Sequence, residues 1–109
     1  MQIERLSISP RFRGPPRSGN GGYVCGRIAA HLGTTARVRL KVPPPLDVEL
    51  RLESSGQQAQ LFHGEILIGE GSNAELDLQV PASPSFEQAE SSSRSFVGFH
   101  EHPFPGCFV

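Results

Sequence analysis

The chain has 109 residues and a formal net charge of −1, with ten Lys and Arg against eleven Asp and Glu. This length fits one domain, and the near-balanced charge argues against a protein dedicated to nucleic-acid binding. No apolar run reaches the ~18 residues of a membrane span, and the polar start lacks the apolar core of a secretory signal. Two cysteines do not make a disulfide framework. We therefore expect one cytoplasmic domain over residues 1–109, with neither a membrane nor a nucleic acid as its partner.

The charges are unevenly distributed along the chain. Residues 1–51 hold nine basic and three acidic side chains, whereas residues 52–109 hold one basic and eight acidic ones. A basic half could attract an anionic ligand. The simpler interpretation, which we prefer, is that the two halves pack together and partly neutralise each other.

The first third of the chain predicts a strand, a loop and a helix. A short strand is expected over residues 8–12 and a glycine-rich loop over residues 17–22. Residues 23–32 repeat apolar side chains at helical spacing, which predicts an amphipathic helix. Ser18 or Asn20 could cap the start of this helix.

The pattern also predicts the surroundings of three residues in this helix. Cys25 falls on the apolar face and is expected to be a packing residue, whereas His31 is expected to face solvent. Gly26 lies inside the helix, where glycine costs up to ~1 kcal/mol relative to alanine. That cost suggests that another part of the chain packs closely against Gly26.

The middle of the chain predicts four strands of an antiparallel meander. Apolar and charged residues alternate over 36–42 and over 48–53, as in a sheet with one buried and one solvated face. Opposite charges on these two strands would pair with each other. Further strands are expected over 58–62 and 65–78, joined by a turn at His63-Gly64. A single helix suggests an α+β fold in which the antiparallel sheet wraps around that central helix.

The last part of the chain, residues 84–109, predicts a short helix followed by an extended tail. Ser85 and Gln88 have the spacing of a capping box that opens a helix. His100, His102 and Cys107 are metal-ligating types at close spacing, but a structural zinc site needs a fourth ligand. We therefore expect no metal and no cofactor.

The order of these elements resembles the hotdog fold. The sequences FRGPP at residues 12–16 and SGNGGYV at residues 18–24 look like the loop and helix start of acyl-CoA thioesterase-like hotdog proteins. The tail sequence HPFPGCF at residues 102–108 is also similar to a segment of that group. The resemblance implies that the chain binds an acyl-CoA or related acyl thioester at a homodimer interface, with the helix start beside the thioester carbonyl.

Catalytic roles at this site would fall to Asn20, Gly21 and Gly22. Backbone N–H groups at a helix start are unpaired and could stabilise the oxyanion that forms when a thioester is attacked. Asn20 would position water or substrate, but an amide cannot act as a general base. Because the sequence around the helix contains no Asp or Glu, a carboxylate would have to come from Asp47, Glu65 or another chain.

Substrate-binding roles would fall to five further residues. Arg13 and Arg17 flank the expected entrance, and guanidinium groups suit the phosphates of CoA. An apolar tunnel beside Val24 and Ile28 would take the acyl chain. Tyr23 would bind substrate at the helix start, where its backbone N–H, like those of Gly21 and Gly22, could stabilise the oxyanion. Two solvated loop arginines are an equally good interpretation of Arg13 and Arg17.

The sequence is therefore compatible with three functions. The first is an acyl-CoA thioesterase-like protein that binds an acyl-CoA thioester and hydrolyses it. The second is a non-catalytic module that binds an acyl or CoA ligand or serves assembly, and the missing carboxylate is its main support. A hotdog dehydratase is the weakest, because that chemistry pairs a histidine with a carboxylate and no histidine lies near the loop.

Overall fold

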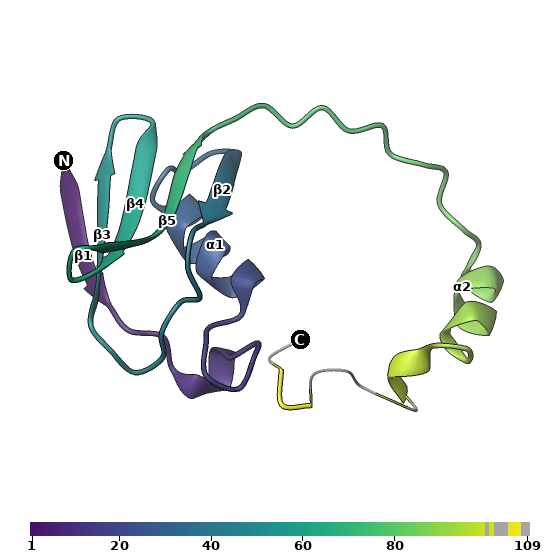
Figure 1. Ribbon diagram of the computed structural model, residues 1–109. Helices are drawn as coiled ribbons and strands as arrows, with labels where there is room; N and C mark the ends of the chain where they lie inside the picture. The colour runs from purple at the N-terminus through teal and green to yellow at the C-terminus, as the bar shows by residue number, and fades with distance from the viewer. Residues whose placement is uncertain (100, 102–104, 108–109) are drawn as a thin grey trace.

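The computed structural model describes residues 1–99, 101 and 105–107, and it shows an α+β fold (Figure 1). Five antiparallel strands form one sheet in the order β1-β3-β4-β5-β2, and one of two α-helices packs against it. The strands are β1 (Gln2–Leu6), β2 (Ala36–Leu40), β3 (Leu50–Ser55), β4 (Gln58–His63) and β5 (Ile66–Asn73). The helices are α1 (Gly21–Ala30) and α2 (Phe86–Ser93), with short 3-10 helices at Pro10–Phe12 and Val97–Phe99. None of the described helices has the length and apolarity to span a membrane.

The first strand lies earlier than the sequence pattern predicted. It covers Gln2–Leu6, whereas the expected strand over residues 8–12 contains a 3-10 helix. The Ser9 side chain caps that helix by accepting a hydrogen bond from the N–H of Arg11. Pro10 follows the cap and has no N–H to donate to a neighbouring strand, so this segment turns instead of joining the sheet.

Strands β3, β4 and β5 form the expected meander, but β2 does not pair with β3. It pairs with β5, where Arg39 lies opposite Glu70, while β1 occupies the place beside β3. The charge pairs predicted between β2 and β3 are therefore wrong. Lys41 instead forms an ion pair with Glu70 on β5 at 3.2 Å. The connection through α1 joins β1 at one edge of the sheet to β2 at the other edge, so β2 is separated from β3 by β4 and β5.

The core lies between α1 and one face of the sheet. Its buried apolar residues are Ile8, Val24, Ile28, Leu50, Leu52, Ala59, Leu61 and Ile68. Ile28 of α1 approaches the backbone of β5 at two glycines. A Cβ atom at Gly69 would lie 3.2 Å from Ile28 Cδ1 and 3.0 Å from Leu40 Cδ2, and one at Gly71 would lie 3.1 Å from Ile28 Cγ2. These two glycines allow the helix to sit close to the sheet.

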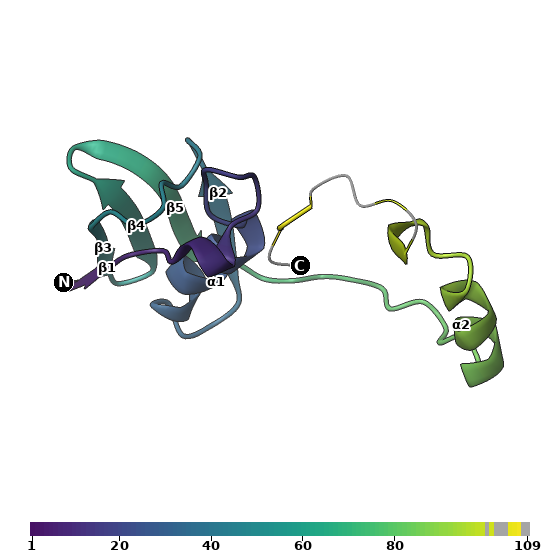
Figure 2. The same ribbon diagram turned by 90° about the horizontal axis from the view of Figure 1, so that it is seen from below.

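Beyond β5 the chain leaves the sheet and extends towards α2 (Figure 2). Strand β5 ends at Asn73, earlier than predicted, and the N–H of Ala74 still donates to the Thr35 carbonyl at 3.0 Å. The capping box is confirmed, because Ser85 and Gln88 each accept a hydrogen bond from the other's N–H. Every residue of α2 is exposed. The radius of gyration is accordingly 17.1 Å, against about 13 Å for a compact chain of this length.

The expectation of close packing at Gly26 is wrong, and this gives a stability prediction. Gly26 is exposed, and a Cβ atom there would meet nothing within 4 Å. Gly26→Ala is expected to raise the free energy of unfolding by about 0.5–1 kcal/mol, because alanine loses less backbone entropy in a helix. Urea unfolding followed by circular dichroism measures the change.

Gly69→Ala is the matched control, because the same methyl group would there meet Leu40, Ile28 and the Arg39 carbonyl. It is expected to lower the free energy of unfolding by about 1–3 kcal/mol through overpacking. If the two substitutions changed stability in the same direction, the packing described for α1 on β5 would be incorrect.

Candidate functional site

Helix α1 starts from a loop that is hydrogen-bonded to neighbouring segments. The N–H of Gly19 donates to the Pro44 carbonyl at 2.8 Å, and the N–H of Asn20 donates to the Phe12 carbonyl, also at 2.8 Å. A Cβ atom at Gly19 would lie only 2.9 Å from Val24 Cγ2, so a larger residue does not fit there. The glycine-rich loop thus fixes where α1 begins.

Asn20 is the N-cap of α1, one of the two caps that the sequence suggested. Its Oδ1 accepts a hydrogen bond from the N–H of Tyr23 at 3.0 Å. Its Nδ2 lies 3.7 Å from the Sγ of Cys107 in the tail and donates to it. Both polar ends of the Asn20 side chain are therefore in use within the protein.

Gly21 and Gly22 form the exposed first turn of α1. In the part of the chain that the structure describes, neither glycine N–H makes a hydrogen bond with protein. Unpaired N–H groups and the helix dipole make this turn an electropositive end that can accept a carbonyl or anionic oxygen. A Cβ atom at Gly21 would lie 3.7 Å from Leu40 Cδ1, which is an ordinary contact.

An aromatic pair and Arg13 lie near this first turn. The rings of Phe12 and Tyr23 stack with centroids 4.2 Å apart and an interplanar angle of 6°. Arg13 contacts the C-terminal tail, where its Nε donates a hydrogen bond to the Gly106 carbonyl at 3.1 Å. Arg17 is exposed on the loop. The structure thus brings Arg13 and Tyr23 to the helix start, together with Phe12, which the sequence analysis had not assigned a role.

Val24 and Ile28 lie on a different side of α1. They face the sheet and expose 1% and 0% of their surface, so they are core residues. An acyl chain that contacted them would have to enter the core between α1 and the sheet. Their predicted role in binding stays a prediction.

The proposed carboxylates lie outside this cluster of contacts. Asp47 is exposed with a φ of 55°, and its N–H donates to the Ile8 carbonyl at 3.0 Å. Glu65 is exposed in the turn between β4 and β5. Among the described residues, neither side chain forms a hydrogen bond or ion pair with the helix start. The source of a general base therefore stays open.

Neither cysteine shows the features of a nucleophile. Cys25 is half-buried, and this burial raises the pKa of its thiol above the ordinary value, which disfavours the reactive thiolate. Cys107 accepts the hydrogen bond from Asn20. His100 and His102, the other two candidate metal ligands, lie outside the described residues. In the described part of the chain, no cluster of three or more His, Cys, Asp or Glu could hold a metal ion.

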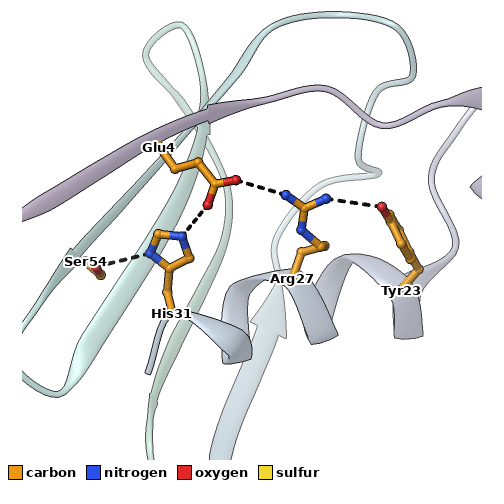
Figure 3. A network of polar contacts seen from close by, with 5 residues as sticks. All are labelled: Glu4, Tyr23, Arg27, His31 and Ser54. Atoms are coloured by element: carbon orange, nitrogen blue, oxygen red, sulfur yellow. Dashed lines mark hydrogen bonds and ion pairs between the residues drawn. The ribbon is translucent and has the colours of Figure 1, made fainter. Parts of the chain in front are cut away.

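Polar side chains along α1, from Tyr23 in its first turn to His31 at its C-cap, form a network that the sequence patterns did not indicate (Figure 3). Its members are Glu4, Tyr23, Arg27, His31 and Ser54. The Glu4 carboxylate accepts from Arg27 Nη2 at 3.0 Å and lies 2.5 Å from His31 Nε2. The expectation that His31 faces solvent is wrong, since its side chain is only 16% exposed. The contacts that Glu4 makes with Arg27 and His31, and that His31 makes with Ser54, join residues more than twenty positions apart, and such contacts leave no local pattern in a sequence.

The line Ser54–His31–Glu4 places a hydroxyl, an imidazole and a carboxylate in contact. Such a line can activate a serine nucleophile. Here the His31 Nδ1 lies 3.3 Å from Ser54 Oγ, but Ser54 is only 7% exposed and is paired with β1 and β4 on its two sides. A substrate has no route to that hydroxyl. The network instead links the edge strand β1 to α1.

A hollow of about 340 Å³ lies on the face of the sheet that α1 does not cover. Its lining is polar and comes from β2, β4 and β5, with Arg37, Arg39, Gln58, Gln60, Glu70 and Ser72. Neighbouring positions on these strands, such as Val38 and Leu61, face the core. The hollow is therefore separated from the helix start by the thickness of the sheet.

The Glu4 network predicts a pH dependence of stability. The hydrogen bond from His31, aided by the charge of Arg27, holds the pKa of Glu4 below its ordinary value of 4.5. Ionised Glu4 therefore stabilises the folded state above about pH 4.5, and that contribution is lost as the pH falls through the lowered folded-state pKa. Glu4→Gln is expected to destabilise the protein near neutral pH, and the difference from the wild type is expected to shrink in acid.

Urea unfolding of both proteins between about pH 3 and about pH 7 measures this difference. Glu65→Gln, which removes an exposed carboxylate with no described ion pair, is the matched control and should change stability little. A wild-type advantage over Glu4→Gln that stayed constant down to the acid end would contradict the assignment.

Comparison of the chain with protein-family models, with curated proteins and with solved structures finds no match. The structure itself establishes an α+β fold with a five-stranded antiparallel sheet and one helix packed on it. It also shows that this helix opens with two exposed glycines beside an aromatic pair.

Proposed function

We propose that the chain is a hotdog-fold, acyl-CoA thioesterase-like protein that binds an acyl thioester at the start of α1. Two lines of support meet here. The chain has the element order that led to the hotdog resemblance, with a strand, a glycine-rich loop, a helix and then antiparallel strands. The observation that carries the binding proposal is the exposed first turn at Gly21 and Gly22, whose N–H groups make no described hydrogen bond with protein.

The chemistry of a thioester suits this turn. A carbonyl oxygen can accept hydrogen bonds from both glycine N–H groups, and no Cβ atom stands between them and the ligand. The helix start carries about half a positive charge, which favours the oxygen of a polarised carbonyl. Arg13 and Arg17 lie on the same loop and could pair with CoA phosphates. In this arrangement the acyl chain runs from Gly21 past Tyr23 and reaches Val24 and Ile28 only by entering the core between α1 and the sheet, and a second copy completes the site.

The state of Asn20 favours binding without hydrolysis. Its Oδ1 holds the N–H of Tyr23 and its Nδ2 donates to Cys107, so Asn20 would have to give up the helix cap before it could direct a water molecule. A non-catalytic acyl-ligand module is therefore the form of the proposal that we favour. Hydrolysis would additionally require a carboxylate from Asp47, Glu65 or a second chain.

Thermal unfolding in the presence of acyl-CoA tests binding. A ligand that binds only the folded state raises stability by about 2.7 kcal/mol at one hundred times its Kd. We expect acyl-CoA of at least one chain length to raise the melting temperature of the wild type. Gly21→Val should abolish that rise, because its side chain would occupy the place of the carbonyl oxygen.

Gly26→Val is the matched control, since it places the same side chain on an exposed position of the same helix where nothing lies within 4 Å. It should retain the full ligand-induced rise. If no acyl-CoA raised the melting temperature of the wild type, the proposed function would be wrong. An unchanged rise in Gly21→Val would remove the helix start from the site.

Release of the CoA thiol distinguishes binding from hydrolysis. We expect the wild type to release thiol no faster than buffer does, while the same acyl-CoA still raises the melting temperature. If turnover were observed and Asn20 positioned the water, Asn20→Ala would slow it by about 10²-fold or more. Asn20→Ala also removes the cap, at a cost of about 1 kcal/mol, whereas Asn20→Ser retains a capping oxygen and so separates the two effects.

A further inference from the structure

Residues 75–80 have the pattern of a strand but belong to no sheet in the described structure. Their sequence is ELDLQV, in which acidic or polar residues alternate with apolar ones, as in a half-buried strand. The apolar members are Leu76, Leu78 and Val80, which are 69%, 69% and 88% exposed. Figure 1 shows this segment running outside the sheet on its way to α2. Three large apolar side chains at alternate positions therefore lack a buried environment.

The sheet has an open edge with the complementary pattern. Among the described residues, β2 makes strand pairs with β5 alone, so its other edge offers free N–H and C=O groups. Val38 and Leu40 of β2 pack against the core, whereas Arg37 and Arg39 are exposed on the opposite face. Neither arginine forms an ion pair within the described part of the chain. An added strand would thus meet apolar residues on one face and two cations on the other.

From this complementarity we propose that residues 75–80 of one copy pair as a sixth strand with the β2 edge of a second copy. Strand alternation couples the two faces of the added segment. When Leu76 and Leu78 turn to the core side, next to Val38 and Leu40, Glu75 and Asp77 necessarily turn to the face of the two arginines. Apolar burial and charge pairing therefore favour the same register.

The whole segment cannot pair with the free edge of its own β2. Asn73 is paired with Ala36, and the N–H of Ala74 donates to the Thr35 carbonyl, so the chain is held beside β2 up to that point. A strand on the far side of β2 would lie about 9.6 Å from β5, which is two strand spacings. About three extended residues are needed to cover that distance. Leu76 would therefore lie in the connection and could not pair with β2. Pairing of the whole segment, with Leu76 and Leu78 both covered, therefore requires a second copy.

The charges also select this pairing over two alternatives. Two β2 edges that paired with each other would bring Arg37 and Arg39 of both copies onto one face, where like charges repel. The other sheet edge, β1, carries Glu4 on its helix-facing side, where an added strand would place its leucines. Of the two sheet edges in the described structure, the β2 edge is the one with an apolar side at Val38 and Leu40 and with arginines that form no ion pair on the other side.

Mutual exchange of the segment makes a closed dimer, since each copy has one free β2 edge and one segment to donate. Glu75→Arg with Asp77→Arg places cations opposite Arg37 and Arg39 and should raise the dimer dissociation constant by about tenfold or more. Arg37→Glu with Arg39→Glu should do the same. The chain with all four substitutions should dimerise as the wild type does, because it exchanges the signs of both partners. Sedimentation equilibrium of the full chain measures each constant.

Glu87→Arg with Glu90→Arg is the matched control, because it makes the same change of net charge on the exposed helix α2. It should leave the dimer constant unchanged. Hydrogen exchange locates the contact: the amides of residues 75–80 should become protected as concentration rises in the wild type and should lose that protection in the Glu75 and Asp77 double variant. A wild-type monomer at all concentrations, or a dimer indifferent to both double variants, would overturn the proposal.

The inference concerns the β2 edge and does not use the helix start. Failure of the thermal-shift experiment on acyl-CoA and failure of the sedimentation experiment are therefore distinguishable. A chain that binds acyl-CoA and stays monomeric would lose this proposal and also the second copy's part in the proposed site. A dimer with protected residues 75–80 that binds no acyl-CoA would lose the proposed function alone.

Discussion

The close approach of Ile28 to the backbone of β5 is the contact on which the rest of the structure depends. A single helix has to cover one whole face of a five-stranded sheet, and it can do so only if it lies near the central strands. Gly69 and Gly71 make that possible, because any side chain on the helix face at these positions would strike Ile28. With α1 held there, its first turn lies near Leu40 of β2, whereas His31 at its C-cap contacts Ser54 of β3 and Glu4 of β1.

The C-terminal end of α1 is held by polar contacts, whereas its N-terminal turn stays open. Arg27 and His31 both bind Glu4, so β1 is tied to α1 although it lies at the edge of the sheet. At the other end, Asn20 caps only the N–H of Tyr23 and leaves Gly21 and Gly22 exposed. A helix fixed at one end and open at the other can present its first turn to a ligand without moving, which is the property that a binding site at this turn requires.

Much of this arrangement could be predicted from local patterns, and the failures have a common cause. The alternation over β2 and β3, the helical spacing of α1 and the capping box at Ser85 all lie within a few residues, and each predicts its element correctly. The pairing of β2 with β5 and the contact of His31 with Glu4 depend on the tertiary path of the chain, which no local pattern encodes. At the candidate site, the sequence identified Asn20 as a possible cap, but it could not show that Cys107 takes up the other end of its amide.

The uneven distribution of charge gains a more specific meaning from the structure. The simple interpretation was that a basic first half and an acidic second half neutralise each other within one chain. Lys41 and Glu70 do so. Among the described residues, Arg37 and Arg39 form no ion pair, although Arg39 lies opposite Glu70, and Glu75 and Asp77 lie on the segment that leaves the sheet. Charges that are complementary in sequence but separated in the fold can still meet between two copies. Strand exchange between copies would pair the charges that do not meet within one copy. It would also cover the open edge of β2.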